Sequence, residues 1–117
     1  MTTPTQLPLP LPAPLSPSNR ETLARLARRD WHQQAACAGY RCDDWFPHPA
    51  DRRTAARALA VCRRCPVITE CLASGLVGNE HGIWGGTTED DRDLILADLA
   101  AGLPIPVALA GRMGEAA

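Results

Sequence analysis

The stretch Cys62-Arg63-Arg64-Cys65-Pro66-Val67-Ile68-Thr69-Glu70-Cys71 carries the strongest chemical signal in this chain, because it places three cysteines close together. Two thiols at positions i and i+3 can face the same way on a helical turn, so Cys62 and Cys65 can share one metal centre. Cys71 falls on the apolar face of the segment that follows, and the fold can bring Cys37 back to it from upstream. Four thiolates from separate elements are typical of a zinc site or an iron–sulfur cluster.

The spacing of these cysteines helps to choose between the two kinds of centre. Many structural zinc sites use two short pairs of Cys or His, whereas this chain has a single C-x2-C pair, a gap and one distant cysteine. A larger cluster accommodates such uneven spacing more naturally than one tetrahedral ion, so the spacing favours an iron–sulfur cluster. Two alternatives stay open, a structural zinc module and a thiol–disulfide oxidoreductase that uses Cys62 and Cys65. No thioredoxin-like βαβ pattern surrounds that pair.

The fifth cysteine, Cys42, follows Arg41 in a polar loop and has no cysteine partner at short range. We expect it to be a bystander, with a spare thiol for redox exchange as the alternative. An odd number of cysteines without a convincing secretion signal argues against a disulfide framework and for metal or redox chemistry.

Length and composition limit the class of protein. The chain has 117 residues and a net charge of −1, which suggests one domain at most and announces no nucleic-acid partner. No apolar run approaches the ~18 residues of a membrane span, so we expect a soluble, cytoplasmic protein with no membrane partner. Because the chain has few aromatic residues for a hydrophobic core, we expect a bound metal to contribute to its stability. The aromatic residues are Trp31, Tyr40, Trp45, Phe46 and Trp84.

Helical periodicity predicts an all-α fold of four or so short helices packed around the cluster. The first helix is expected after Ser18, capped by that residue with Glu21 as its reciprocal partner. Its apolar positions continue at helical spacing through Leu23, Leu26, Ala27, Trp31 and Ala35. The second helix is expected over residues 51–60.

The third and fourth predicted helices follow the cysteine stretch. Pro66 suits the first position of a helix whose apolar face is Ile68, Cys71, Leu72 and Leu76. Thr88 is the expected cap of the last helix, which runs to about Gly102 and has acidic residues in its first turn.

The domain organisation follows from composition. Residues 1–17 hold six of the eleven prolines and are expected to be a disordered, extended tail. Residues 18–103 form the predicted iron–sulfur domain, and residues 104–117 a flexible C-terminal tail.

The Gly82-Ile83-Trp84-Gly85-Gly86 segment predicts a tight turn, because glycines on both sides of Trp84 permit positive φ angles. Such a turn could leave Trp84 exposed as an interface anchor, since Trp is enriched among interface hot spots. The alternative is that Trp84 folds inward as part of the scarce aromatic core.

With these motifs the chain resembles the WhiB-like family of actinobacterial iron–sulfur transcription regulators. The resemblance covers about residues 31–92 and is most specific in the cysteine stretch and the glycine-rich turn. Four segments carry it: Trp31 to Cys37, Trp45-Phe46-Pro47, Cys62 to Cys71, and Gly82 to Gly86 followed by Thr87 and Arg92.

The resemblance implies one [4Fe-4S] cluster on Cys37, Cys62, Cys65 and Cys71, and a redox-responsive transcription regulator, not an enzyme, that is sensitive to oxygen or nitric oxide. It also implies binding to the C-terminal domain of the principal sigma factor of RNA polymerase. The residues implied in that contact are the turn and the aromatics near the cluster: Trp84, Gly82, Gly85, Gly86, Trp45 and Phe46.

One departure from the family concerns DNA. Many members end in a basic segment, whereas the residues after Gly102 contain Arg112 as their only basic side chain. Ten of the twelve arginines precede Cys65, so the first and second helices form the only basic surface. We therefore expect DNA binding to be weak or to occur through the sigma complex.

Overall fold

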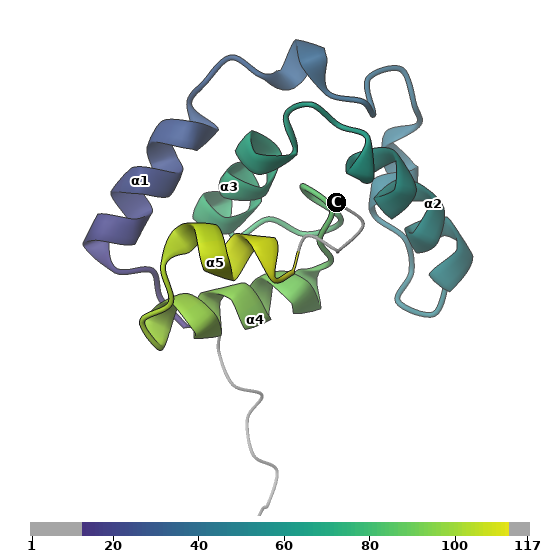
Figure 1. Ribbon diagram of the computed structural model, residues 1–117. Coiled ribbons are helices and arrows are strands. Elements are labelled where there is room, and N and C mark those ends of the chain that lie inside the picture. The colour runs from purple at the N-terminus through teal and green to yellow at the C-terminus, as the bar shows by residue number, and fades with distance from the viewer. Residues whose placement is uncertain (1–12, 113–117) are drawn as a thin grey trace, which may run out of the picture.

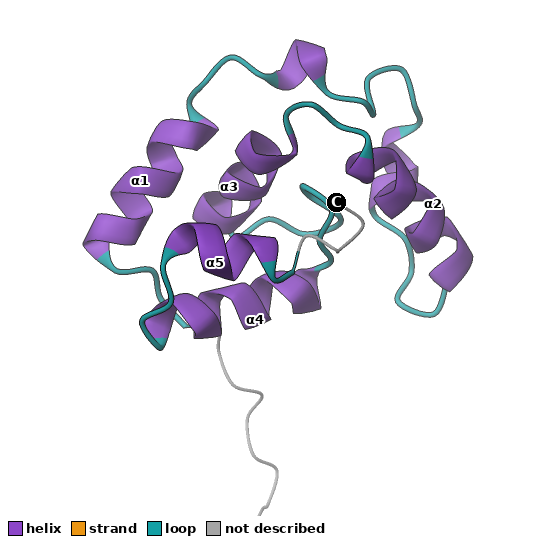
Figure 2. Cartoon of the chain, in the orientation of Figure 1, coloured by secondary structure: helices purple, strands orange, loops and turns teal. Residues whose placement is uncertain are grey.

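The computed structural model describes residues 13–112, and within them the chain is all-α, as predicted. The expected N-terminal tail falls mostly outside this range. The described residues form five α-helices and two short 3-10 turns, and Figures 1 and 2 show how loops connect them. The helices are α1 (Pro17–Ala27), α2 (Arg52–Arg63), α3 (Ile68–Gly78), α4 (Glu89–Ala100) and α5 (Ile105–Ala110), and the 3-10 turns are η1 (His32–Gln34) and η2 (Cys42–Trp45).

The larger core lies among α1, α3, α4 and α5. Leu23 of α1, Leu72 of α3 and Ile95 of α4 have no exposed surface, and each such burial contributes about 1.5–3 kcal/mol. In Figure 1, α1 lies alongside α3, and α5 lies next to α4. We call these four helices the four-helix body.

A second, smaller core forms where α2 meets the loop before it and the turn after α3. Its buried members are Trp45, Ala58, Val61, Cys62 and Ile83. Figure 1 shows α2 at one edge of the molecule, apart from the four-helix body. A core this small, in which one member is a cysteine, is where a metal staple would add most stability.

The first helix differs from its prediction at both ends. It begins at Pro17, and Ser16 rather than Ser18 is the N-cap, its Oγ accepting the Asn19 N–H at 3.1 Å. It ends at Ala27 rather than continuing towards Ala35, because the Trp31 indole folds back and donates to the Ala27 carbonyl at 3.2 Å. That hydrogen bond satisfies a carbonyl that a longer helix would have used.

The next two helices are shifted relative to their predicted bounds. Asp51 is the N-cap of α2, accepting the Thr54 N–H at 3.1 Å, and the helix extends to Arg63, so Cys62 lies in its last turn. The prediction that Pro66 begins the third helix is wrong: α3 begins at Ile68, and Val67 is its N-cap.

The start of α4 is as predicted. Thr88 accepts the Asp91 N–H at 3.2 Å while the Asp91 carboxylate accepts the Thr88 N–H at 2.9 Å, which is a complete capping box.

The segment after Leu103 is not simply a flexible tail. It contains α5, in which Ala108 and Leu109 are buried against the four-helix body. Pro104 and Pro106 permit this helix because they occupy its N-cap and second position, where a missing N–H breaks no helical hydrogen bond.

Candidate metal centre

Four elements bring the predicted ligand cysteines together. Cys37 lies in the loop after η1, Cys62 in the last turn of α2, Cys65 in the turn between α2 and α3, and Cys71 in the first turns of α3. All four line one cavity of about 290 Å³ between α2 and the start of α3. The fold therefore places the four cysteines around one cavity, and their role as ligands stays a prediction.

The thiols of this cavity are close enough to influence one another. The pKa of the Cys71 thiol is raised to about 12, chiefly by burial and in smaller part by Cys62, Cys37 and Cys65, while a backbone hydrogen bond from Gly85 acts in the opposite direction. Burial also raises the pKa of Cys37, again with contributions from Cys62 and Cys65. Because their pKa values are raised, Cys37 and Cys71 need a cationic partner to become thiolates.

The geometry of the cysteines does not suit a single ion. Within residues 13–112, no three His, Cys, Asp or Glu side chains lie where they could hold one metal ion. A tetrahedral zinc site needs its sulfurs about 2.3 Å from the ion. The four cysteines instead line an open cavity of about 290 Å³, which has room for a centre of several atoms.

Backbone donors point at the sulfurs. The Ala36 N–H donates to Cys65 Sγ at 3.4 Å, and the Gly85 backbone bonds Cys71. Hydrogen bonds of this kind favour the thiolate form and tune the properties of a bound metal centre.

Aromatic side chains wall the cavity. The Trp31 ring stacks on His32 with a centroid distance of 3.8 Å. Tyr40, half exposed, packs edge-on to Trp45 at 5.7 Å, and its hydroxyl accepts a hydrogen bond from Arg64. The sequence showed the aromatics but gave no signal for these pairings.

Cys42, expected to be a bystander, also lines the cavity with an exposed thiol. None of the five cysteines forms a disulfide, and all five lie within the residues that the structure describes.

The glycine-rich turn packs against this cavity. Gly85 and Gly86 both have positive φ angles, 57° and 75°, as a type I′ turn requires. The turn is closed by Trp84 and Thr87, whose N–H groups donate to each other's carbonyls at 3.0 and 3.1 Å. A Cβ at Gly85 would lie 2.5 Å from the Leu72 backbone nitrogen, so the turn rests directly on α3.

The predicted partner residues are exposed to different degrees. Trp84 is partly buried, lines the cavity and donates its indole N–H to the His81 carbonyl at 2.8 Å. Trp45 is buried, whereas Phe46 is 53% exposed. A Cβ at Gly82 would lie 2.6 Å from the Phe46 ring, so Phe46 and the turn form one continuous surface.

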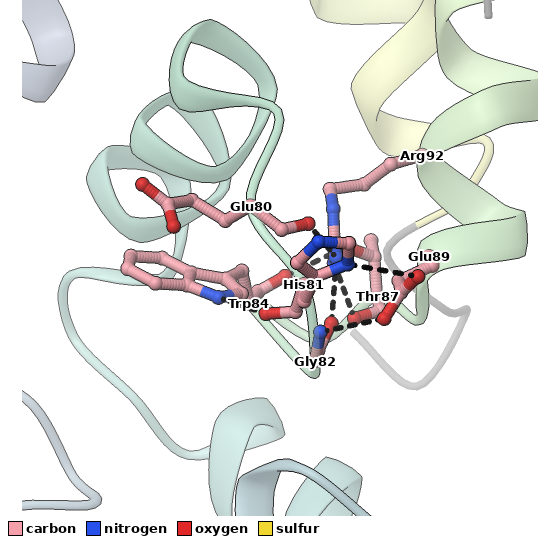
Figure 3. Close-up of polar contacts among 7 residues, drawn as sticks. All are labelled: Glu80, His81, Gly82, Trp84, Thr87, Glu89 and Arg92. Atoms are coloured by element: carbon pink, nitrogen blue, oxygen red, sulfur yellow. Dashed lines mark hydrogen bonds and ion pairs between the residues drawn. The ribbon is translucent and has the colours of Figure 1, made fainter. Parts of the chain in front are cut away.

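Arg92 holds this turn in place, a role that the sequence did not reveal (Figure 3). Its buried guanidinium donates to the carbonyls of Thr87, Glu80 and Gly82 at 2.9, 3.0 and 2.6 Å, and to the Thr87 hydroxyl at 3.0 Å. Burial lowers the pKa of Arg92, but an arginine stays charged in proteins. A second tie is the Gly82 N–H, which donates to Glu89 at 2.9 Å and lowers the pKa of that carboxyl.

The described residues form a small helical protein in which four cysteines line one cavity and Arg92 braces the turn beside it. A family model described as "Transcription factor WhiB" matches residues 31–95, which include all four cysteines and the turn. This chain belongs to that family.

Curated relatives agree with this assignment. The chain is 42% identical over 95 residues to the transcriptional regulator WhiD of Streptomyces coelicolor, covering 75% of this chain and 84% of the relative. It is 42% identical over 74 residues to the redox- and pH-responsive transcriptional regulator WhiB3 of Mycobacterium tuberculosis, covering 57% and 72%. It is 43% identical over 68 residues to WhiB1 of the same species, covering 54% and 80%. No solved structure matches the chain.

None of the helices in the described part of the chain is long and apolar enough to cross a membrane.

Proposed function

We propose that this chain binds one [4Fe-4S] cluster through Cys37, Cys62, Cys65 and Cys71 and is a redox-responsive regulator of transcription in the cytoplasm. The observation that carries the proposal is that these four cysteines line one cavity with room for a centre of several atoms. The relatives named as redox-responsive regulators support the same function.

The two rival centres fit the site less well. A structural zinc ion requires a tight tetrahedron, which the cysteines do not form in the described residues. A thiol–disulfide oxidoreductase requires an accessible, low-pKa attacking thiol, but Cys62 is only 8% exposed. We therefore propose a binding protein rather than an enzyme.

The chain's own contribution is to link its two cores through the centre. Cys62 belongs to the small core around α2, whereas Cys71 lies on α3 of the four-helix body. Ligands from both sides hold the two parts in one arrangement, because metal-binding free energy is also folding free energy in small domains. When bound, a cluster of this type supplies reactivity towards oxygen or nitric oxide.

We further propose that the surface beside the cavity binds the C-terminal domain of the principal sigma factor. Phe46 is exposed, Gly82 packs on it, and Trp84 lines the cavity one turn away. Trp45 and Gly85 line the cavity beside this surface, and Gly86 completes the turn that follows Trp84. Because Phe46 and Trp84 line the same cavity as the four cysteines, a change in the bound centre would directly alter the partner surface.

The direct test is the composition of the protein purified without oxygen. We expect about four iron and four sulfide per chain, a brown colour and a broad visible absorption that fades in air. A colourless protein with one zinc per chain, or with no metal, would contradict the proposal.

A further inference from the structure

The outer face of α2 carries a dense arginine surface. The sequence from Arg52 to Thr69 contains no aspartate or glutamate, and all of its arginine side chains are exposed. At 3.6 residues per turn, Arg53, Arg57 and Arg64 fall in one row along the helix, and the others in a second row beside it. We define the α2 arginine face as Arg52, Arg53, Arg57, Arg63 and Arg64.

Three arginines in and directly after α1 differ from this face, because each of them pairs with a carboxylate. Arg25 and Arg28 pair with Glu21 at 3.3 and 3.9 Å, and Arg29 pairs with Glu70 at 3.7 Å. In the part of the chain that the structure describes, no carboxylate pairs with any member of the α2 arginine face. Two members bond neutral oxygens instead: Arg57 to Thr54 and Arg64 to Tyr40, both at 3.3 Å.

The acidic residues near α2 either form its N-cap or lie on the side of the helix opposite the arginines. Asp51 is occupied as the N-cap of the helix. Glu89 and Asp90 of α4 line a cavity with Ala55, which is roughly 200° around the helix from Arg53. The α2 arginine face is therefore directed away from the carboxylates of α4.

Positive and negative charges are also separated along the chain, with most arginines before Pro66 and most acidic residues after it. Before Pro66 there are ten arginines and five acidic residues, whereas from Pro66 onward there are two arginines and eight acidic residues. Within the first part, residues 51–65 hold five arginines and one acidic residue, so the positive charge is densest at α2 although the net charge of the chain is only −1.

The chemistry of the face matches the backbone of a DNA duplex. A helix of 12 residues is ~18 Å long, and a duplex carries about ten phosphates over that length. Guanidinium groups bind phosphate oxygens in a bidentate manner. The exposed residues between the arginines are small alanines, Ala56 and Ala60, whereas an interfacial membrane helix needs bulky apolar residues.

We propose that the α2 arginine face contacts the phosphate backbone of duplex DNA without reading its sequence. Contacts of guanidinium groups with phosphate oxygens position a protein on the duplex and carry no sequence information. The proposal rests on membership of a transcription-factor family and requires neither the cluster nor the sigma contact to be correct.

The test compares two double variants of the full chain, purified without oxygen. R53Q/R57Q removes two members of the face, and R25Q/R28Q removes two exposed arginines that are already paired with Glu21. Binding to a labelled duplex of mixed sequence is followed by fluorescence anisotropy over a range of salt concentrations. We expect R53Q/R57Q to reduce the slope of log affinity against log salt by about 2 and to weaken binding on the order of tenfold or more in 0.1 M salt. We expect R25Q/R28Q to bind like the wild type.

Visible absorption and affinity for the sigma domain are measured on the same samples, so that failure of the proposed function is seen separately. The DNA proposal fails if the wild type does not bind the duplex at low salt, or if R53Q/R57Q keeps the wild-type slope. Equal losses of DNA affinity in the two double variants would mean that DNA responds to the overall charge rather than to the α2 arginine face, and would also overturn the proposal. A loss of sigma binding with unchanged DNA binding would assign the arginines to a protein interface instead.

Discussion

The guanidinium of Arg92 donates a hydrogen bond of 2.6 Å to the carbonyl oxygen of Gly82, and so ties the glycine-rich turn to the first turn of α4. The same side chain reaches the carbonyls of Glu80 and Thr87. One buried arginine thus fixes both ends of the turn that presents Trp84.

Arg92→Ala should therefore be one of the most destabilising single substitutions in the chain. It leaves several carbonyl oxygens without donors, and buried unsatisfied groups cost about 1–3 kcal/mol each. We expect a loss of about 3 kcal/mol in the free energy of unfolding, which lowers Tm by roughly 10 °C or more. Arg92→Lys should recover only part of this, because one ammonium cannot span Glu80 and Thr87. Thermal unfolding followed by circular dichroism measures both, with the exposed Arg20→Ala as control; equal Tm values for Arg92→Ala and Arg20→Ala would refute the bracing role.

The ligand assignment predicts a divided outcome for the cysteines. Serine at Cys37, Cys62, Cys65 or Cys71 should abolish or strongly reduce iron, sulfide and visible absorption. Cys42→Ser should retain the normal spectrum, although its thiol lines the same cavity, because the other four supply a complete ligand set. A normal cluster in any of the four variants, or its loss in Cys42→Ser, would show that the ligand set is wrong.

The proposed sigma contact is tested best at Phe46, since its exposure separates binding from folding. Phe46 is 53% exposed, and Val107 of α5 is 54% exposed, so Val107→Ala is a matched control. A buried aromatic anchor contributes ~2 kcal/mol or more to an interface, roughly a thirtyfold change in Kd. We expect Phe46→Ala and Trp84→Ala to weaken binding to the sigma domain by about this factor in anaerobic calorimetry, and Val107→Ala to have no effect.

Because Trp84 is partly buried, its variant also needs the absorption spectrum as a readout. If Trp84→Ala loses the cluster before it loses affinity, the side chain belongs to the core. If both aromatic variants keep full affinity, the contact lies elsewhere on the molecule.

Substitutions at two glycines with positive φ distinguish the cost of backbone strain from the cost of close packing. Gly85 and Gly102 have φ angles of 57° and 101°, but a Cβ would lie 2.5 Å from Leu72 at Gly85 and meet nothing within 4 Å at Gly102. Gly102→Ala should cost about 1–2 kcal/mol from strain alone. Gly85→Ala should cost about 1–3 kcal/mol more from overpacking and shift the turn away from Cys71. Denaturant unfolding of the two variants gives the difference, and equal costs would mean that the turn does not rest tightly on α3.

Much of the fold was predictable where the signal is local. The capping box of Thr88 and Asp91 fixes the start of α4. The N-cap of α2 is Asp51, which directly precedes residues with helical periodicity. The helix of Pro104 and Pro106 was missed because prolines usually end helices, and only the packing of Leu109 against the body shows that this one forms. The end of α1 was missed because the Trp31 indole replaces a helical donor.

The site was predictable in its ligands but not in its supports. Cysteine spacing could be read from the sequence, and the four cysteines that it singles out line one cavity, while their role as ligands stays a prediction. Arg92 follows three acidic residues in an exposed-looking helix start, and nothing local shows that its guanidinium is buried among carbonyls. Its partners come from the far side of a turn whose shape depends on Gly85 and Gly86.

The division of the molecule into two cores has a consequence for how it opens. The four-helix body has its own buried leucines, whereas the smaller core includes Cys62 and few large side chains. Parts of a protein with few buried apolar contacts open locally at lower free energy than the rest. Without metal, the amides of α2 should exchange with solvent well before those of α1 and α3. Proteases in the cell would then meet an opened segment, so the lifetime of this protein would follow the state of its cysteines.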